Sequence, residues 1–275
     1  ALQEVERYWQ RSGYVDQPAQ IGQILINYYW AYGPYFDVDG SESEFDGSIK
    51  NIRRQFGNMI LSKTPILSTR LFPLPKSALR QRHNMVVGVF EGVVKLQNDG
   101  ALRIYNAHLG ARSQLDRVAQ INSIRQTIRS APAEGGAWTG PHSQSVWEAH
   151  GHTLWEEDSS PPPMPESFVL LGDFNLEYKD PEYDHLVGPM DGNLGRISSK
   201  EDFIDTWVAT GHGEDEGATY LNTTSSGETQ GIRIDYAFVD ESMQKRILGA
   251  RIDEQAQGSD HQPYWIELDY APNNK

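Results

Sequence analysis

The chain has 275 residues, of which 38% are hydrophobic and 23% are charged, and its 38 acidic residues against 24 Lys and Arg give a formal net charge of −14. This composition is typical of a soluble folded protein, and the negative charge argues against long-range attraction to nucleic acids or anionic membranes. Cysteine is absent, which excludes disulfides, thiolate metal ligands and a cysteine nucleophile.

No apolar run reaches the roughly 18 residues that a membrane-spanning helix needs, because the stretch from Met85 to Val94 is short and contains Glu91. We therefore expect a soluble chain without an integral membrane segment, and one domain over residues 1–275. The chain begins at Ala1 with neither an initiator Met nor an apolar leader, so the sequence does not indicate a compartment.

The predicted elements are short β-type runs separated by helices and loops. Alternation around Leu102 and Ile104 predicts a half-buried strand that ends in Asn106-Ala107-His108-Leu109. Apolar residues then recur every three or four positions, which predicts a helix with one buried stripe, made of Leu115, Val118, Ile121, Ile124 and Ile128.

Residues 131–167 are rich in Pro, Gly, Ser and His and are predicted to form a long loop or insertion. Three histidines in it, His142, His150 and His152, raise the possibility of a second metal site. Because they lack acidic or cysteine partners at fixed spacing, we favour a solvated loop. The tryptophans of this segment could stack on a base, shape a lid or anchor the loop to the core.

Phe168 to Leu171 is a continuous apolar run, typical of a strand buried on both faces, and it stops at Gly172-Asp173-Phe174-Asn175. Ile234 to Val239 and Trp265 to Leu268 repeat the pattern, with polar groups at or before the start of each run. No regular βαβ period or Gly-rich phosphate loop is present, so a core of two sheets with outer helices is favoured.

Polar clusters beside these runs suit phosphoryl transfer. Carboxylates such as Glu4 and Asp260 are the hard oxygen ligands that magnesium or manganese prefers, while Asn175 and His108 can donate hydrogen bonds to phosphate oxygens. His261 is a candidate proton acceptor, and Asp235 is our choice for the carboxylate that orients it.

Each cluster alone has an ordinary structural interpretation. Asp173 with Asn175 is by itself more typical of a turn or helix cap, and Asp260-His261 of a loop. A single Asp235 in a strand is usually an ion-pair partner. We expect Tyr28-Tyr29-Trp30 to lie in the core. Two basic groups are interpreted as solvated surface rather than phosphate contacts, namely Arg53-Arg54 and residues 80–83.

Six motifs together reverse those interpretations. They resemble, in order, the signature motifs of the endonuclease/exonuclease/phosphatase family, and Arg117 and Gln120 in the following helix are similar to the family's usual sequence there. The motifs are Leu2-Gln3-Glu4-Val5, residues 57–63 (GNMILSK), Asn106-Ala107-His108-Leu109, Gly172-Asp173-Phe174-Asn175, Arg233-Ile234-Asp235-Tyr236 and Gly258-Ser259-Asp260-His261.

The resemblance implies an α+β fold, a four-layer αββα sandwich in which two packed mixed β-sheets are flanked by helices. It implies Mg²⁺ or Mn²⁺ as cofactor, with Glu4 and Asp260 on the metal side. It also implies phosphate contacts at His108 and Asn175, a water-orienting or basic Asp173, and a catalytic His261 oriented by Asp235.

Family members begin with a strand that supplies a metal-binding Asn and lies upstream of the Leu-Gln-Glu motif. No residues precede Ala1 in this sequence, so the N-terminal strand is apparently missing. We expect residues upstream of Ala1 to belong to the working protein and to tighten metal binding.

The expected function is metal-dependent hydrolysis of a phosphate ester, with phosphodiesters somewhat favoured, by in-line attack of an activated water. The substrate classes that fit are a small molecule, a lipid head group or a nucleic acid. Two alternatives are a true DNA or RNA nuclease and a catalytically inactive binding domain of the same fold. Retention of all seven site residues argues against the inactive domain.

Overall fold

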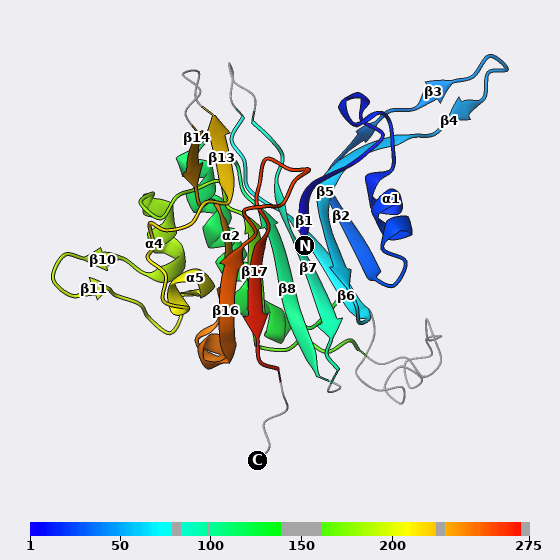
Figure 1. Ribbon diagram of the computed structural model, residues 1–275. Coiled ribbons are helices and arrows are strands. Elements are labelled where there is room, and N and C mark those ends of the chain that lie inside the picture. Colours follow the sequence, from blue (N-terminus) through cyan, green and yellow to red (C-terminus); the bar gives the residue numbers. More distant parts are fainter. Residues whose placement is uncertain (79–83, 98–99, 139–160, 224–228, 271–275) are drawn as a thin grey trace, which may run out of the picture.

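A computed structural model of the chain is shown in Figure 1. The structure describes residues 1–275 except 79–83, 98–99, 139–160, 224–228 and 271–275. Two of the sequence-based hypotheses therefore fall outside the described residues. They concern the possible metal site at His142, His150 and His152 and the basic residues 80–83. In the described part, none of the helices combines the length and apolarity needed to cross a membrane.

The larger sheet has six strands in the order β12-β15-β9-β8-β7-β6. Only β8 and β9 run parallel, and every other neighbouring pair is antiparallel. The two runs predicted as strands from their apolar residues, β8 and β9, lie at its centre. The strand bounds are β6 (Ile66–Pro73), β7 (Gly88–Lys95), β8 (Ala101–His108), β9 (Phe168–Asp173), β12 (Ile204–Asp205) and β15 (Asp235–Val239).

The smaller sheet has three strands in the order β1-β5-β2, and both pairs are antiparallel. The expectation of two mixed sheets is therefore wrong for this sheet. Strands β2 and β5 are joined through a projecting hairpin of β3 and β4, and a hairpin connection makes neighbours antiparallel. The bounds are β1 (Leu2–Arg7), β2 (Tyr29–Asp39), β3 (Glu42–Ser43), β4 (Ile49–Lys50) and β5 (Arg53–Ser62).

The two sheets pack face to face, with β2 against β6 and β5 against β7 and β8. Helices α2 (Gln114–Glu134) and α4 (Pro181–Val187) lie on the outer side of the larger sheet, and α1 (Gln17–Ile24) lies on the outer side of the smaller one (Figure 1). The predicted four-layer sandwich is thus confirmed.

The main core lies between α2, α4 and the larger sheet. The predicted stripe of α2 buries Ile121, Ile124 and Ile128 against residues such as Tyr105 and Leu170. This stripe burial removes apolar surface from water and stabilises the packing of helix on sheet.

The first turn of α2 departs from the predicted stripe, because Leu115 is 83% exposed. Polar groups are buried there instead. The Asp116 carboxylate accepts hydrogen bonds from Ser77 and Asn84, and the Arg117 guanidinium pairs with Glu182. Satisfied hydrogen bonds make this polar burial tolerable.

Two further expectations need correction. Helix α2 runs to Glu134, so the loop predicted from residue 131 begins after the first four residues of that range. Tyr29 and Trp30 are 52% and 39% exposed rather than buried in the core. They begin strand β2 at the edge of the smaller sheet, where the Trp30 ring lies over Gly22 of α1.

The remaining described elements are short. They are η1 (Gln10–Ser12), β10 (Met190–Asp191), β11 (Gly195–Arg196), α5 (Thr206–Ala209), β13 (Tyr220–Thr223), β14 (Thr229–Ile232), η2 (Glu241–Arg246), β16 (Ile247–Ile252) and β17 (Tyr264–Leu268).

Candidate active site

Three adjacent strands of the larger sheet bring predicted site residues to one edge. In the parallel pair β8 and β9, His108 is the register partner of Asp173. In the antiparallel pair β9 and β15, Asp173 is the register partner of Asp235. Backbone ladders therefore place the three side chains beside one another, although they are far apart in the sequence.

A glycine permits this close pairing. Gly172 has φ +138, and a Cβ at this position would lie 1.9 Å from the Ala107 carbonyl oxygen of the neighbouring strand. Any other residue would push β8 and β9 apart immediately before His108 and Asp173. The glycine of the Gly172-Asp173-Phe174-Asn175 motif is therefore required by backbone packing.

His261 and Asp235 form a hydrogen-bonded pair, with 2.7 Å between His261 Nδ1 and Asp235 Oδ2. The strand start that carries Asp235 is held by Thr219, whose hydroxyl oxygen accepts hydrogen bonds from the Ile234 and Asp235 amides. Because the carboxylate accepts, Nδ1 carries a proton and Nε2 faces away from Asp235. This is the arrangement that the sequence predicts for these two residues.

The charge state of His261 is controlled by competing effects. Burial lowers the pKa of its imidazole, but the hydrogen bond to Asp235 and the negative charges of Asp235, Asp173 and Asp260 outweigh burial and raise the pKa to about 9. In the metal-free protein His261 is therefore protonated at neutral pH.

His108 lies at the centre of the cluster. Its Nε2 is 3.7 Å from both Glu4 Oε1 and Asp173 Oδ2, and its Nδ1 is 2.8 Å from the Tyr35 hydroxyl. Burial, followed by the positive charge of His261, lowers the pKa of His108 to about 4, so the ring is neutral at pH 7. Two carboxylates near Nε2 favour the tautomer with a proton on that nitrogen, which leaves Nδ1 to accept from the Tyr35 hydroxyl.

Asp173 and Asn175 form a compact turn. The Asn175 backbone amide donates to Asp173 Oδ1, and its Nδ2 donates to Asp173 Oδ2 and to the Leu109 carbonyl. Both Nδ2 hydrogens are thus engaged within the protein. The predicted phosphate contact of Asn175 therefore requires one of these hydrogen bonds to exchange with the substrate.

The Asp173 carboxyl is a weak acid in this setting. Burial, followed by the negative charge of Asp235, raises its pKa to about 7, although His261 and the Asn175 amide act in the opposite direction. A carboxylate whose pKa lies near neutrality is a stronger base than an ordinary aspartate, which suits proton abstraction from water.

Glu4 comes from the other sheet. The register between β1 and β5 shifts between Leu2 and Val5, and Glu4 itself has φ 56, a backbone conformation that residues other than glycine rarely adopt. Bulges of this kind re-aim side chains beside active sites. Here the irregularity brings the half-exposed Glu4 carboxylate within 3.7 Å of His108 Nε2.

Glu4 and Asp260 are close enough to influence each other. Burial raises the pKa of Glu4, Arg11 and His261 lower it, and the negative charge of Asp260 raises it further. Among the described residues, no group of three Asp, Glu or His side chains is placed to enclose a metal ion. Two accessible carboxylates nonetheless fit Mg²⁺, which proteins commonly hold through one or two carboxylates together with waters and substrate phosphate.

A pair of amides joins the two sheets next to these groups. Gln3 Nε2 donates to Asn106 Oδ1 at 2.6 Å, and Asn106 Nδ2 donates to the carbonyls of Leu2 and Met59. We call Gln3 and Asn106 the cross-sheet clamp. Gln3 precedes Glu4 and Asn106 lies two residues before His108, so the clamp fixes the relative positions of Glu4 and His108.

Sequence reasoning missed Tyr35, which reaches the site from strand β2. Space for its ring exists because Gly88, the register partner of His108, has no side chain; a Cβ there would lie 2.7 Å from the Tyr35 ring. No local pattern marks Tyr35, since it lies 73 residues from His108 in sequence and in the opposite sheet.

We expect Tyr35→Phe to lower kcat about 10-fold, because the loss of one hydrogen bond worth about 1 to 1.5 kcal/mol corresponds to a factor of up to about ten in rate. The variant loses the donor that keeps the Nδ1 lone pair occupied, so the His108 tautomer is no longer fixed. Steady-state kinetics with a nitrophenyl phosphodiester measures the loss, and ¹⁵N NMR of the imidazole reports the tautomer.

The matched control is Tyr32→Phe on the same strand, because the Tyr32 hydroxyl donates to the Val5 carbonyl rather than to a histidine. Equal kinetics and an unchanged imidazole spectrum in Tyr35→Phe would show that Tyr35 does not position His108.

The low pKa of His108 predicts acid-sensitive stability. The folded value is about 4 against 6.5 for the ordinary imidazole, so the unfolded chain binds more protons between these two values. The stabilisation from the neutral ring is fully present above pH 6.5 and is lost as the pH falls through 6.5 towards 4, by up to about 3 kcal/mol.

Urea unfolding of the metal-free protein in EDTA, compared with His108→Asn at pH 7.5 and pH 4.5, isolates this contribution. We expect the free energy of unfolding to fall more in the wild type than in the variant. Parallel pH dependences would contradict a buried neutral His108.

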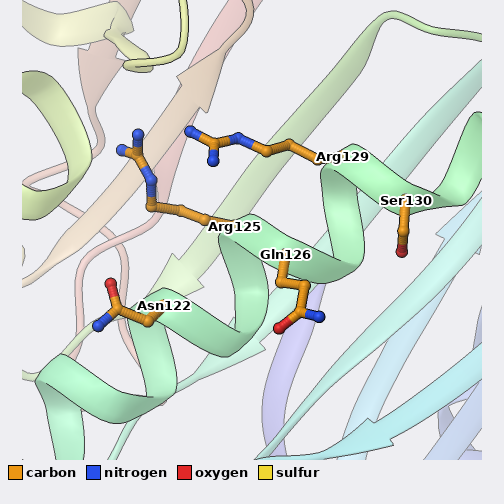
Figure 2. A pocket seen from close by; sticks show the side chains of 5 residues that line it. All are labelled: Asn122, Arg125, Gln126, Arg129 and Ser130. Carbon is orange, nitrogen blue, oxygen red and sulfur yellow. The ribbon is translucent and has the colours of Figure 1, made fainter.

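A surface hollow elsewhere contains none of the predicted site residues. Figure 2 shows it on α2, lined by Asn122, Arg125, Gln126, Arg129 and Ser130. Its two arginines form ion pairs with Asp202 and Glu201, respectively. The arginines thus tie the helix to a neighbouring loop.

The family model described as "Endonuclease/Exonuclease/phosphatase family" matches residues 1–261. The chain belongs to this family. The resemblance in the six motifs is thereby confirmed, and the matched residues extend from β1 to His261, the partner of Asp235. Members of the endonuclease/exonuclease/phosphatase family hydrolyse phosphoester bonds.

Solved structures share the fold. A Beutenbergia cavernae endonuclease/exonuclease/phosphatase aligns with TM-score 0.56 and 16% identity, over 97% of this chain and 61% of that one. A D. rerio TDP2 humanized by 14 mutations aligns with TM-score 0.53 and 16% identity, over 92% and 82%. A Bacteroides thetaiotaomicron family protein aligns with TM-score 0.52 and 15% identity, over 92% and 79%. A search of curated proteins found no match.

Proposed function

We propose that this chain is a divalent-metal-dependent phosphoesterase that hydrolyses a phosphodiester by in-line attack of an activated water. The observation that carries the proposal is the hydrogen bond of 2.7 Å between His261 Nδ1 and Asp235 Oδ2. Asp235 lies beside Asp173 and Asp173 beside His108 in the larger sheet, so this hydrogen bond stands next to both. An imidazole held by one carboxylate beside a second carboxylate of raised pKa is suited to moving protons during phosphoryl transfer.

The two titrating groups have distinct proposed roles. Asp173, whose pKa is raised to about 7, orients the attacking water and accepts its proton. His261, whose pKa is raised to about 9, carries a positive charge towards the phosphate oxygens. Asp235 stabilises that charge and holds the ring through Nδ1. The sequence-based hypothesis made His261 the proton acceptor, whereas its raised pKa favours Asp173 in that role.

His108 supplies a neutral donor. Its Nε2 hydrogen, kept in place by the Tyr35 hydroxyl at Nδ1, can bind a phosphate oxygen without adding a charge. Asn175 can join it by exchanging one of its internal hydrogen bonds. Together His108 and Asn175 would bind the phosphate next to Asp173.

Glu4 and Asp260 are the residues that would hold the metal, Mg²⁺ or Mn²⁺. Bound there, the ion would neutralise charge on the phosphate oxygens. The half-exposed Glu4 carboxylate and the exposed Asp260 leave room for water and substrate oxygens in its coordination shell.

The test is a hydrolysis screen of the purified chain with Mg²⁺ and with Mn²⁺. The substrates are a nitrophenyl phosphodiester, a nitrophenyl phosphomonoester, single- and double-stranded DNA, RNA, phosphoinositides and sphingomyelin. His261→Ala, purified in parallel, controls for contaminating enzymes. Hydrolysis lost in His261→Ala supports the proposal, whereas absence of hydrolysis with every substrate and both metals would leave the inactive binding domain as the better interpretation.

A further inference from the structure

A second cavity opens beside the proposed catalytic cluster. It has a volume of about 440 Å³ and lies between the segment after β1, the smaller sheet and the residues before β7. The lining residues that matter here are Trp9, Arg11, Phe36, Phe56, Lys76 and Asn84. Ligand pockets commonly have volumes of roughly 300–1,000 Å³, so this space can take a small organic group.

The cavity adjoins the catalytic cluster through one shared wall. The Phe56 ring, which lines the cavity, has its centroid 6.1 Å from that of the His108 ring. The Arg11 guanidinium lies 5.7 Å from the Phe56 ring centroid and is close enough to Glu4 to lower the pKa of that carboxyl. The cavity and the catalytic cluster are therefore neighbours that share Phe56 and Arg11.

Aromatic side chains form a preorganised wall. The Trp9 and Phe36 ring centroids are 5.3 Å apart with planes inclined by 38°, and Trp9 Nε1 donates to the Gln55 carbonyl at 2.8 Å. Both rings are only partly buried. Held aromatic faces that remain accessible to solvent are the surfaces on which nucleobases stack.

Charged side chains line the cavity next to the aromatic rings and limit the kind of ligand that it can bind. Arg11 neutralises the buried Glu6 through a hydrogen bond of 2.6 Å, while the side chain of Arg11 stays 65% exposed. Lys76 is exposed, and its ammonium donates to the Asn84 carbonyl at 3.1 Å. The cavity therefore presents charged and polar groups, among them Lys76 and the Arg11–Glu6 pair, around its aromatic rings, and this favours a polar ligand over a lipid tail.

We propose that this cavity is a nucleobase subsite, so that the substrate is a phosphodiester of a nucleoside, with the base stacked on Trp9 and Phe36 and the phosphate beside His108. The inference rests on the proposed phosphodiesterase function and narrows its substrate class. Recognition by stacking tolerates different bases, since every base offers an aromatic face.

The test compares two phosphodiesters with the same leaving group, the p-nitrophenyl ester of thymidine 5′-monophosphate and methyl p-nitrophenyl phosphate. The measured quantity is the ratio of their kcat/KM values within each protein. This ratio is independent of the fraction of folded enzyme, so partial misfolding of a variant does not affect it.

We expect the wild type to prefer the thymidine ester by about 10-fold or more, and Trp9→Ala and Phe36→Ala to lose most of that preference, as stacking energies imply. Trp9→Phe keeps an aromatic ring and should retain much of it. The matched control is Trp265→Ala, because Trp265 is 50% exposed and carries the Arg251 guanidinium over its ring at 4.8 Å, outside the cavity. This control should leave the ratio unchanged.

Equal kcat/KM values for the two esters in the wild type would overturn the inference while leaving phosphodiester hydrolysis intact. A preference that survives in Trp9→Ala and Phe36→Ala would also overturn it. Calorimetric titration with thymidine 5′-monophosphate covers the case in which neither ester is hydrolysed: binding weakened in Trp9→Ala supports the subsite even though the proposed function fails, and absence of binding to the wild type overturns the subsite as well.

Discussion

His261→Ala should lower kcat for a phosphodiester by about 10²- to 10⁴-fold, the range associated with loss of a positioned acid or base. The reason is the hydrogen bond of 2.7 Å between His261 Nδ1 and Asp235 Oδ2, which orients the ring and stabilises its charged form. Asp235→Asn removes that stabilisation and should cause a loss of similar order. Steady-state kinetics with a nitrophenyl phosphodiester at saturating Mg²⁺ measures both.

The double variant decides whether the two residues act together. Groups that work as one unit lose most of their contribution when either is removed, so the combined loss should be far smaller than the product of the single losses. His212→Ala is the matched control, because His212 Nδ1 lies 3.7 Å from Glu216 in a histidine–carboxylate pair outside the site. Fully multiplicative losses would show that His261 and Asp235 act independently.

Glu4→Gln and Asp260→Asn should each weaken Mg²⁺ binding by about 10-fold or more, because a divalent ion held by so few protein ligands depends strongly on each carboxylate. At subsaturating metal the activity should fall with the affinity, and raising the Mg²⁺ concentration should recover part of it. Calorimetric titration gives the affinity directly, and activity against metal concentration gives it independently.

Glu267→Gln controls for the change in net charge, since Glu267 is an exposed carboxylate on β17 away from the cluster. It should bind Mg²⁺ as the wild type does. If Glu4→Gln and Asp260→Asn also bind with wild-type affinity, the metal site lies elsewhere and the roles implied by the motifs do not hold for these two carboxylates.

The central strands were predictable because burial on both faces leaves a local signature. Phe168 to Leu171 is uniformly apolar and is followed directly by Gly172 and Asp173, so the run predicted a buried strand with Asp173 at its end. Asp235 was predictable for the same reason at the start of β15. The motifs then indicated that these separate strand ends belong together.

Other features depend on contacts that no local pattern encodes. The engagement of both Asn175 Nδ2 hydrogens depends on the position of the Leu109 carbonyl, and Tyr35 reaches His108 from the opposite sheet. The exposure of Trp30 depends on β2 being an edge strand. The periodicity of apolar residues predicts which face of a helix or strand is buried. It does not predict the order of strands in a sheet or the packing of one sheet on another, because distant parts of the chain determine both.

The cross-sheet clamp of Gln3 and Asn106 divides the site into two mechanical parts. His108, Asp173 and Asp235 stand on one hydrogen-bonded sheet, so their spacing moves little when that sheet slides as a body. Glu4 lies on the other sheet, so its distance of 3.7 Å from His108 Nε2 is held by the clamp rather than by a backbone ladder. Shear between the two sheets is therefore expected to change the distance from Glu4 to the larger sheet before it changes the spacing of His108, Asp173 and Asp235, and the Asn106 hydrogen bonds to Leu2 and Met59 oppose that shear.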